Sequence, residues 1–151
     1  MAYEFKIGRF TQGEGLETAL DNHGSIVAAT ALQHVGTLKG AFMVGGHGAR
    51  GGEQWTPWSR RYAIDRAFRG KTHILIDTGA MRHSIYAGQP SPGPRVVVLI
   101  GTNIEYAHKH QYGTMMIPQR PFLVTTSVDK ENIAGRIARW ATVALNGVGG
   151  V

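Results

Sequence analysis

The apolar positions of the chain first mark out short runs that predict β-strands. Residues 96–100 read V-V-V-L-I between Pro94 and Gly101, and a short β-branched run with such boundaries is typical of a buried strand. Residues 72–77 read T-H-I-L-I-D and predict a second strand. Residues 3–9 alternate weakly between apolar and polar positions, as a short strand or an ordered arm would.

The stretch that follows the strongest strand predicts a corner and another extended piece. Residues 103–112 are polar and aromatic, and Gly113 ends them. Residues 117–123 contain Pro118 and Pro121, which favour an extended path into a final apolar run. We therefore expect a strand, a corner and a second strand, and we interpret this stretch as structural rather than as a set of catalytic groups.

Two segments of the first half show helical spacing. Apolar residues recur three and four apart over 16–38, but Gly24 and Gly36 weaken the pattern, which predicts one interrupted helix or two short ones. Ser59 is a suitable N-cap for a helix over 60–69. Its residues Ala63, Ile64, Ala67 and Phe68 share one face of that helix.

A last helix is predicted to begin near Val128, capped by Ser127 or Asp129, and to end at 146–147. Residues 146–151 would then form a loose tail. Residues 80–86 predict a short turn or helix. The order of elements indicates a single α+β domain over 1–151, with a small, mostly antiparallel sheet packed by N-terminal helices and a C-terminal helix. One apolar stripe of that last helix holds Ile133, Ile137, Ala141 and Leu145, with Trp140 and Ala144 beside it.

Composition narrows the classes of protein. A chain of 151 residues with 42% apolar and 17% charged residues is long enough to bury a core as one domain. It has no cysteine, which excludes disulfides and thiolate metal sites. No apolar leader and no run of transmembrane length is seen, so we expect a soluble protein.

The net charge of +6 permits contact with nucleic acid or an acidic partner without demanding it. On the predicted helix, Arg61, Asp65 and Arg69 stand at i,i+4 spacing and can pair, which favours a solvated face. The alternative is that the basic side chains of this segment contact phosphates, which would make the chain a basic nucleic-acid-binding module. The dense basic residues are Arg60, Arg61, Arg66, Arg69 and Lys71.

The glycine-rich loop 44–54 contains a dinucleotide-binding pattern, G-x-G-x-x-G, at Gly46, Gly48 and Gly51. That motif requires a helix N-terminus directly after it, aimed at the pyrophosphate. Here more glycine and then W-T-P-W follow, so we expect a flexible surface loop and no cofactor.

Residues 74–80 read I-L-I-D-T-G-A, which resembles the D-T-G-A loop of retroviral-type aspartic proteases. In such a dimer Asp77 would share one proton with its symmetry mate. Only 23 residues (78–100) separate Asp77 from Gly101, too few for the strands and flap of that fold. The simpler interpretation is a strand that ends in an Asx-type turn.

Four histidines give the other enzymatic alternative, a metal site. His108 and His110 are the closest pair, but they diverge on a helix and only Glu105 stands near them. Surface or interface histidines fit better, and we expect no bound metal. The loosely clustered histidines are His73, His83, His108 and His110.

Several pieces in fixed order resemble the phage virion-morphogenesis family, the tail-completion proteins of Mu-like and P2-like tailed phages. The likeness spans about residues 55–140, and the longer glycine-rich loop ahead of it departs from the family pattern. The pieces are Trp55-x-Pro57, I-L-I-D-T-G-x-M-x-x-S-I at 74–85, I-G-T at 100–102, Tyr106-Ala107, H-Q-Y-G at 110–113 and I-P-x-R-P-F-L at 117–123.

The resemblance implies a structural virion protein with no enzymatic activity and no cofactor. It would cap the tail at the head–tail junction as a homo-oligomeric ring, expected to be a hexamer. Its neighbours would be the tail tube or terminator and the head–tail connector, with DNA near the lumen and no membrane. It would be assembled in the host cytoplasm.

The residues themselves suit such an interface. Arg120, held between Pro118 and Pro121, could reach a carboxylate on an adjacent subunit or pair within its own chain. Amphipathic aromatic residues are enriched at interfaces. The expected interface residues are Trp55, Trp58, Tyr106, His110, Tyr112 and Arg120, of which the two tryptophans could equally be core.

Overall fold

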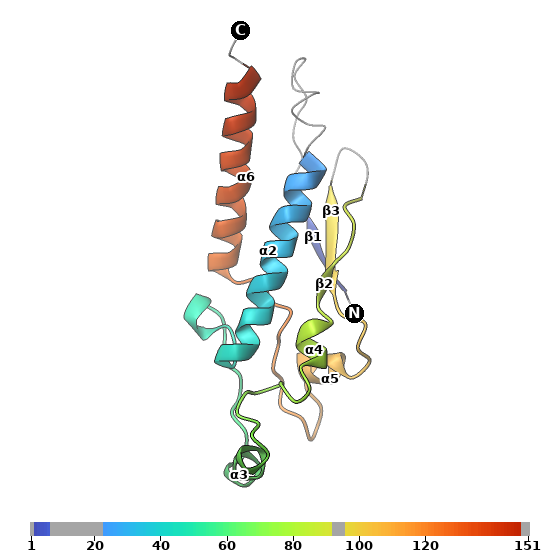
Figure 1. Ribbon diagram of the computed structural model, residues 1–151, viewed down its shortest axis with the longest axis vertical. Coiled ribbons are helices and arrows are strands. Elements are labelled where there is room, and N and C mark those ends of the chain that lie inside the picture. Colours follow the sequence, from blue (N-terminus) through green and yellow to red (C-terminus); the bar gives the residue numbers. More distant parts are fainter. Residues whose placement is uncertain (1, 7–22, 92–95, 149–151) are drawn as a thin grey trace.

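Two long antiparallel helices and a small sheet form the body of the protein. The computed structural model describes residues 2–6, 23–91 and 96–148. Helix α2 lies between helix α6 and the sheet (Figure 1). The predicted α+β class is therefore confirmed. The long helices are α2 (His23–Val44) and α6 (Ser127–Val148), and the strands are β1 (Ala2–Lys6), β2 (Tyr86–Ala87) and β3 (Val97–Gly101).

The sheet is antiparallel, with strand order β1-β3-β2. Ala2 stands opposite Gly101 at one end of the β1–β3 pair. Along β3, Val98 and Ile100 are buried while Leu99 is exposed, as expected for a sheet with one covered face. The strands predicted at 96–100 and near the N-terminus are both confirmed.

Helix α2 is continuous, so the predicted interruption is wrong. Gly36 is exposed, and a Cβ built there would meet nothing within 4 Å, so the glycine costs only its helix propensity. That cost in free energy is small compared with the stabilisation from burying the long apolar face of α2. Residues 16–22 of the expected helix lie outside the described residues. The buried apolar side chains of α2 are Val27, Ala31, Val35, Leu38, Ala41 and Phe42.

Three aromatic rings form the centre of the core. Phe42 lies edge-on to Trp55, with centroids 5.2 Å apart, and to Phe122 at 5.7 Å. The Trp55 indole N–H donates to the carbonyl oxygen of Pro121 at 2.7 Å. Trp55 is only 3% exposed, so it is a core residue, which was one of the two alternatives for this tryptophan.

The strand expected at 72–77 is absent from the described structure, where this segment forms bends and turns. Leu75 adopts a left-handed conformation with φ of 60°, which breaks any extended run. The Ile76 carbonyl accepts a hydrogen bond from the Arg66 guanidinium instead of from a neighbouring strand. The segment is therefore shaped by side-chain contacts that the apolar pattern does not reveal.

The second strand expected at 117–123 is also wrong, because this stretch pairs with a side chain rather than with a strand. Pro118 and Pro121 have no N–H to donate to a ladder. The buried Gln111 side chain accepts from the N–H groups of Phe122 (3.0 Å) and Leu123 (3.1 Å) and donates to the Leu123 carbonyl (3.3 Å). One amide thus satisfies the backbone that a strand partner would otherwise have satisfied.

The glycine-rich loop is folded against the core, contrary to the expected flexible surface loop. It forms the short 3-10 helix η1 (Gly48–Arg50), and Gly46 bridges to Gln54. Gly46 has φ of 142°, and a Cβ there would lie 2.7 Å from the Trp55 nitrogen, so only glycine fits. The close approach buries His47 completely.

Helix α6 begins with a reciprocal cap that was not expected. Thr126 N–H donates to Asp129 Oδ2 (3.0 Å), and Asp129 N–H donates to Thr126 Oγ1 (3.2 Å), which is the arrangement of a capping box. The buried Asp129 also pairs with Arg50 of η1 at 2.5 Å. The helix continues to Val148, so its predicted end at 146–147 is wrong, and the tail residues 149–151 lie outside the described residues.

Only part of the predicted stripe on α6 is covered. Ile133 is buried, whereas Ile137, Trp140 and Ala141 are half-buried, and Val143 is exposed. Within the described ranges, no helix is both long and apolar enough to cross a membrane.

Two buried histidines beneath α6 predict that acid destabilises the protein. Burial lowers the pKa of His34 and His47 below the ordinary 6.5, although the Asp129 carboxylate acts in the opposite direction. His34 Nε2 lies 3.2 Å from Thr125 Oγ1, and neither His47 ring nitrogen makes an aligned hydrogen bond to a described residue.

Because the folded pKa values are lowered, the unfolded chain binds protons first as pH falls below 6.5. The stabilisation present above pH 6.5 is therefore lost progressively under acid. We expect the urea midpoint to fall between about pH 7.5 and about pH 5, and His47→Gln to reduce that fall. A midpoint that is flat with pH, or unaffected by the substitution, would contradict this assignment.

Candidate functional site

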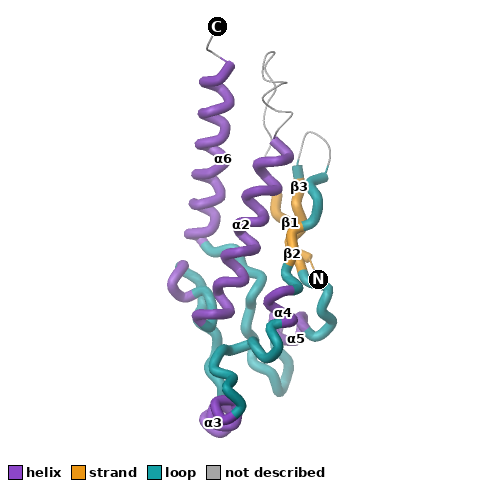
Figure 2. Tube along the Cα trace, in the orientation of Figure 1, coloured by secondary structure: helices purple, strands orange, loops and turns teal. Residues whose placement is uncertain are grey.

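Helix α3 (Arg60–Phe68) projects from the end of the molecule opposite the C-terminus (Figure 1). The predicted N-cap is confirmed, since Ser59 Oγ accepts from Tyr62 N–H at 3.4 Å. No residue of α3 is buried, and Phe68 is 89% exposed. The apolar face identified in the sequence is thus left uncovered by the described chain, and much of the surrounding region is loop (Figure 2).

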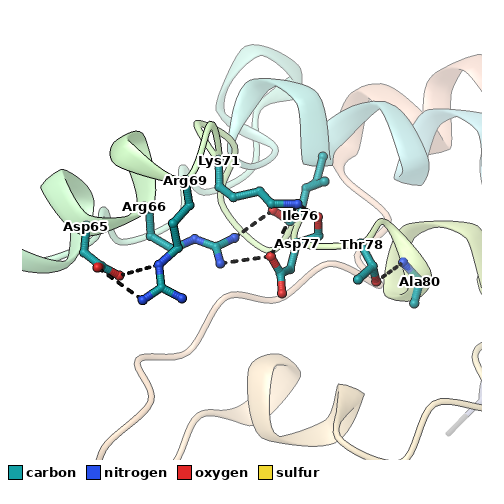
Figure 3. Close-up of polar contacts among 8 residues, drawn as sticks. All are labelled: Asp65, Arg66, Arg69, Lys71, Ile76, Asp77, Thr78 and Ala80. Carbon is teal, nitrogen blue, oxygen red and sulfur yellow. Dashed lines mark hydrogen bonds and ion pairs between the residues drawn. The ribbon is translucent and has the colours of Figure 1, made fainter.

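Arg66 ties α3 to the following turn. Its guanidinium donates to Asp77 Oδ1 and to the Ile76 carbonyl, each at 3.0 Å (Figure 3). The same group lies over the Trp58 ring at 5.4 Å and near the Tyr62 ring at 6.0 Å, distances typical of cation–π contacts. Arg66 is therefore a structural residue that fixes two aromatic side chains and a turn.

The other basic residues divide into paired and unpaired groups. Arg69 pairs with Asp65 at 3.3 Å, as the i,i+4 spacing predicted, and Lys71 donates to the Asp77 carbonyl at 2.7 Å (Figure 3). Arg60 and Arg61 are exposed on α3. The structure thus divides the proposed phosphate-binding set, and contact with nucleic acid stays a prediction.

Asp77 has surroundings unlike those of a protease dyad. The hydrogen bond from Arg66, followed by the charges of Arg66 and Lys71, lowers the pKa of its carboxyl. A shared-proton dyad needs one carboxyl whose pKa is raised by a close second carboxylate. Asp77 also sits in an exposed turn instead of at the end of a strand, where Thr78 Oγ1 accepts from Ala80 N–H (3.3 Å) ahead of α4 (Ala80–His83).

Beside Arg66 lies a hollow of about 970 Å³, which we call the α3–α5 groove. Helix α5 (Ala107–Tyr112) and the loop after it contribute to its lining together with α3. Its lining is mainly aromatic and aliphatic, a composition common in binding sites. It is lined by Pro57, Trp58, Ser59, Tyr62, Arg66, residues 75–81, Tyr106, His110, residues 116–118 and Arg120.

Four of the six expected interface residues line this one groove, from three separate stretches of chain: Trp58, Tyr106, His110 and Arg120. Tyr112 is exposed but is not part of the lining, and Trp55 lies in the core. The Tyr106 and His110 rings meet edge to face at 6.2 Å. Burial, followed by the charge of Arg120, lowers the pKa of His110.

Arg120 is hydrogen-bonded within its own chain. It is buried, and its guanidinium donates to the carbonyls of Thr56 (2.8 Å) and Pro57 (3.5 Å). These hydrogen bonds favour the intrachain alternative for Arg120, and a contact with an adjacent subunit stays a prediction. Arg120 holds the W-T-P-W segment in place at the edge of the groove.

Sequence reasoning missed two prominent features of the groove. One is Tyr62, which appeared only as a helix residue. The other is Met116, which lines the groove and follows Met115 on the loop between Gly113 and Pro118, where both are almost fully exposed. Two consecutive methionines in a polar turn were the signal that could have identified this loop.

The candidate metal-ligating histidines do not gather. His73 and His83 lie in other segments from His108 and His110, and the described residues contain no group of three side chains able to hold a metal ion. His108 Nδ1 lies 2.6 Å from the Glu105 carbonyl oxygen of its own turn.

Comparison with known proteins gives one match. A family model described as the phage virion morphogenesis family matches residues 19–141, which is most of the chain. No curated protein and no solved structure matches the chain.

Proposed function

The chain belongs to the phage virion morphogenesis family, and on that premise we propose that it completes the phage tail where the tail joins the head. It takes part in building the virion. In our proposal it acts as a structural component without enzymatic activity or cofactor. Its copies close into a ring, which we take to be a hexamer, between the tail tube or terminator and the head–tail connector. Assembly takes place in the host cytoplasm.

The observation that carries the proposal is the α3–α5 groove, which is largely apolar and whose lining includes the almost fully exposed Met116. Phe68 on α3 and Met115 are further large apolar side chains that lie in water. Exposed apolar patches and grooves commonly mark sites where another molecule binds. A protein that works by contacts with its neighbours needs such a surface.

The basic character of the chain suits a position near DNA. Arg60 and Arg61 of α3 and Arg136 and Arg139 of α6 are exposed cations. DNA passing through the ring would meet such charges without any reading of base sequence.

The proposal is tested by locating the protein on isolated tails. Tails carrying an epitope-tagged chain, labelled with gold and viewed in negative stain, should show label at the end that joins the head. The purified protein alone or with tails should give a ring in the same images. Label along the tube, at the distal tip or absent from tails would contradict the proposal.

Replacing Asp77 with asparagine is expected to leave head–tail joining largely unchanged. Asp77 is exposed, and Arg66 keeps its hydrogen bond to the Ile76 carbonyl without it, so the loss of the Asp77 carboxylate loosens only one turn. A protease that used Asp77 would lose peptide cleavage completely. The measurement is infective titre after complementation with Asp77→Asn, with Asp65→Asn as the matched control. A loss of joining confined to Asp77→Asn would favour the protease.

A further inference from the structure

The loop that carries Met115 and Met116 is held rigidly in shape by its own hydrogen bonds. Thr114 N–H donates to the Ile117 carbonyl at 2.8 Å, and Thr114 Oγ1 accepts from the N–H groups of Met116 and Ile117. Gly113 has φ of 76°, and a Cβ there would lie 3.0 Å from the Gln119 nitrogen. The two methionines are therefore exposed to solvent on a turn that these hydrogen bonds stabilise.

The α3–α5 groove beside this loop has an apolar and aromatic lining. Met81 of the lining belongs to the core, and Ile76 packs against the core. Trp58 and Tyr106 are the aromatic residues that precede α3 and α5 in the lining. Unbranched methionines on the rim adapt to the shape of an incoming side chain, which suits a surface that receives a large apolar residue.

The charges at one edge of the groove favour an acidic binding partner. Arg66 and Lys71 flank the single carboxylate of Asp77, so positive charge is in excess there. The whole chain carries a net charge of +6, so a second copy presents more positive than negative charge, even though Glu53, Glu105 and Glu131 are exposed on its described surface. A second copy therefore brings mainly repulsion to this edge, whereas an acidic segment of another protein is attracted.

We infer that the α3–α5 groove docks a segment of a different virion protein in which a carboxylate stands next to a large apolar side chain. The apolar side chain fills the hollow between Trp58 and Met116, and the carboxylate lies beside Lys71. This inference rests on the proposed function, because that function supplies the neighbouring virion protein.

Nucleic acid fits the groove less well, although it is also negative. Single-stranded nucleic acid binds through aromatic faces that are free to stack on bases. Here the Trp58 face is covered by Arg66, and the Trp58 and Tyr62 rings meet at 90° with centroids 5.7 Å apart. Exposed methionines also offer nothing to a phosphate backbone.

Photo-crosslinking in assembling phage tests the inference. The photoreactive residue p-benzoylphenylalanine replaces Met116, and the matched control places it at Val143, an exposed apolar position on α6. We expect crosslinks from position 116 to one other virion protein, at a peptide with Asp or Glu beside Leu, Phe or Trp, in at least about tenfold excess over position 143.

Charge reversal tests the electrostatic part. Lys71→Glu should lower the crosslink yield from position 116 about tenfold, whereas Lys130→Glu on α6 should leave it unchanged. Added salt should lower the yield in the unsubstituted protein, which keeps the test independent of any folding defect in Lys71→Glu.

Crosslinks to a second copy, to DNA or to a peptide without acidic residues would overturn the inference, as would equal yields at 116 and 143, no crosslink at 116, or a yield unchanged by Lys71→Glu and salt. Mass spectrometry of purified tails from the same cultures distinguishes a failure of the groove assignment from a failure of the proposed function. A chain present in tails without the expected crosslink refutes only the groove assignment, while a chain absent from virions refutes the proposed function.

Discussion

Trp55→Ala is expected to lower the free energy of unfolding by about 3–5 kcal/mol, the largest effect of any single substitution proposed for this chain. The indole is buried against Phe42, and its N–H is bonded to Pro121, so truncation leaves a cavity and an unpaired carbonyl. The measurement is urea unfolding followed by circular dichroism, with unchanged slope as the condition for comparing midpoints.

Two further variants separate packing from hydrogen bonding at this position. Trp55→Phe keeps much of the apolar volume and loses the bond to Pro121, so it should cost clearly less than Trp55→Ala. Trp58→Ala removes a half-buried ring at the groove and should also cost less. Equal losses for Trp55→Ala and Trp58→Ala would contradict the placement of Trp55 in the core.

Asp129→Ala is expected to lower the free energy of unfolding by about 3 kcal/mol, because one side chain serves three groups. Asp129 is 1% exposed, caps Thr126 N–H, accepts from the Thr126 hydroxyl and pairs with Arg50. Its removal breaks the carboxylate half of the capping box, while the bond from the residue 129 N–H to Thr126 Oγ1 can remain, and it leaves Arg50 without its partner. Arg50 is partly exposed and can turn toward water, which keeps the loss at the lower end of the range for a broken buried pair.

Asp129→Asn is the matched control for Asp129→Ala. The amide oxygen can still accept from Thr126 N–H while the charge opposite Arg50 is gone, so the loss should fall between wild type and Asp129→Ala. A neutral result for Asp129→Ala would show that α6 does not depend on this cap.

The sequence predicted best those elements whose signals are local. Ser59 marks the start of α3 within its own turn, and the β-branched run at 96–100 needs only burial to become β3. Where tertiary contacts decide, the apolar pattern misled. The run at 72–77 looks like a strand until Arg66, from a separate helix, takes the Ile76 carbonyl.

The sequence indicated several of the residues that line the groove, but it did not indicate that these residues lie together. Amphipathic aromatic character was enough to select Trp58, Tyr106 and His110, which the fold brings together. The role of Arg120 could not be read in advance, because its acceptors at Thr56 and Pro57 lie 64 and 63 residues earlier in the chain. Hydrogen bonds from the Arg120 guanidinium to carbonyls so far away in the chain cannot be recognised from the residues next to Arg120.

Completion of the tail is tested most directly by head–tail joining in vitro. Phage grown with a nonsense codon in this gene should yield DNA-filled heads and separate tails, and purified protein added to the mixed lysate should restore infective particles. Particles that form without the protein, or heads and tails that stay apart after its addition, would contradict a role at the head–tail junction.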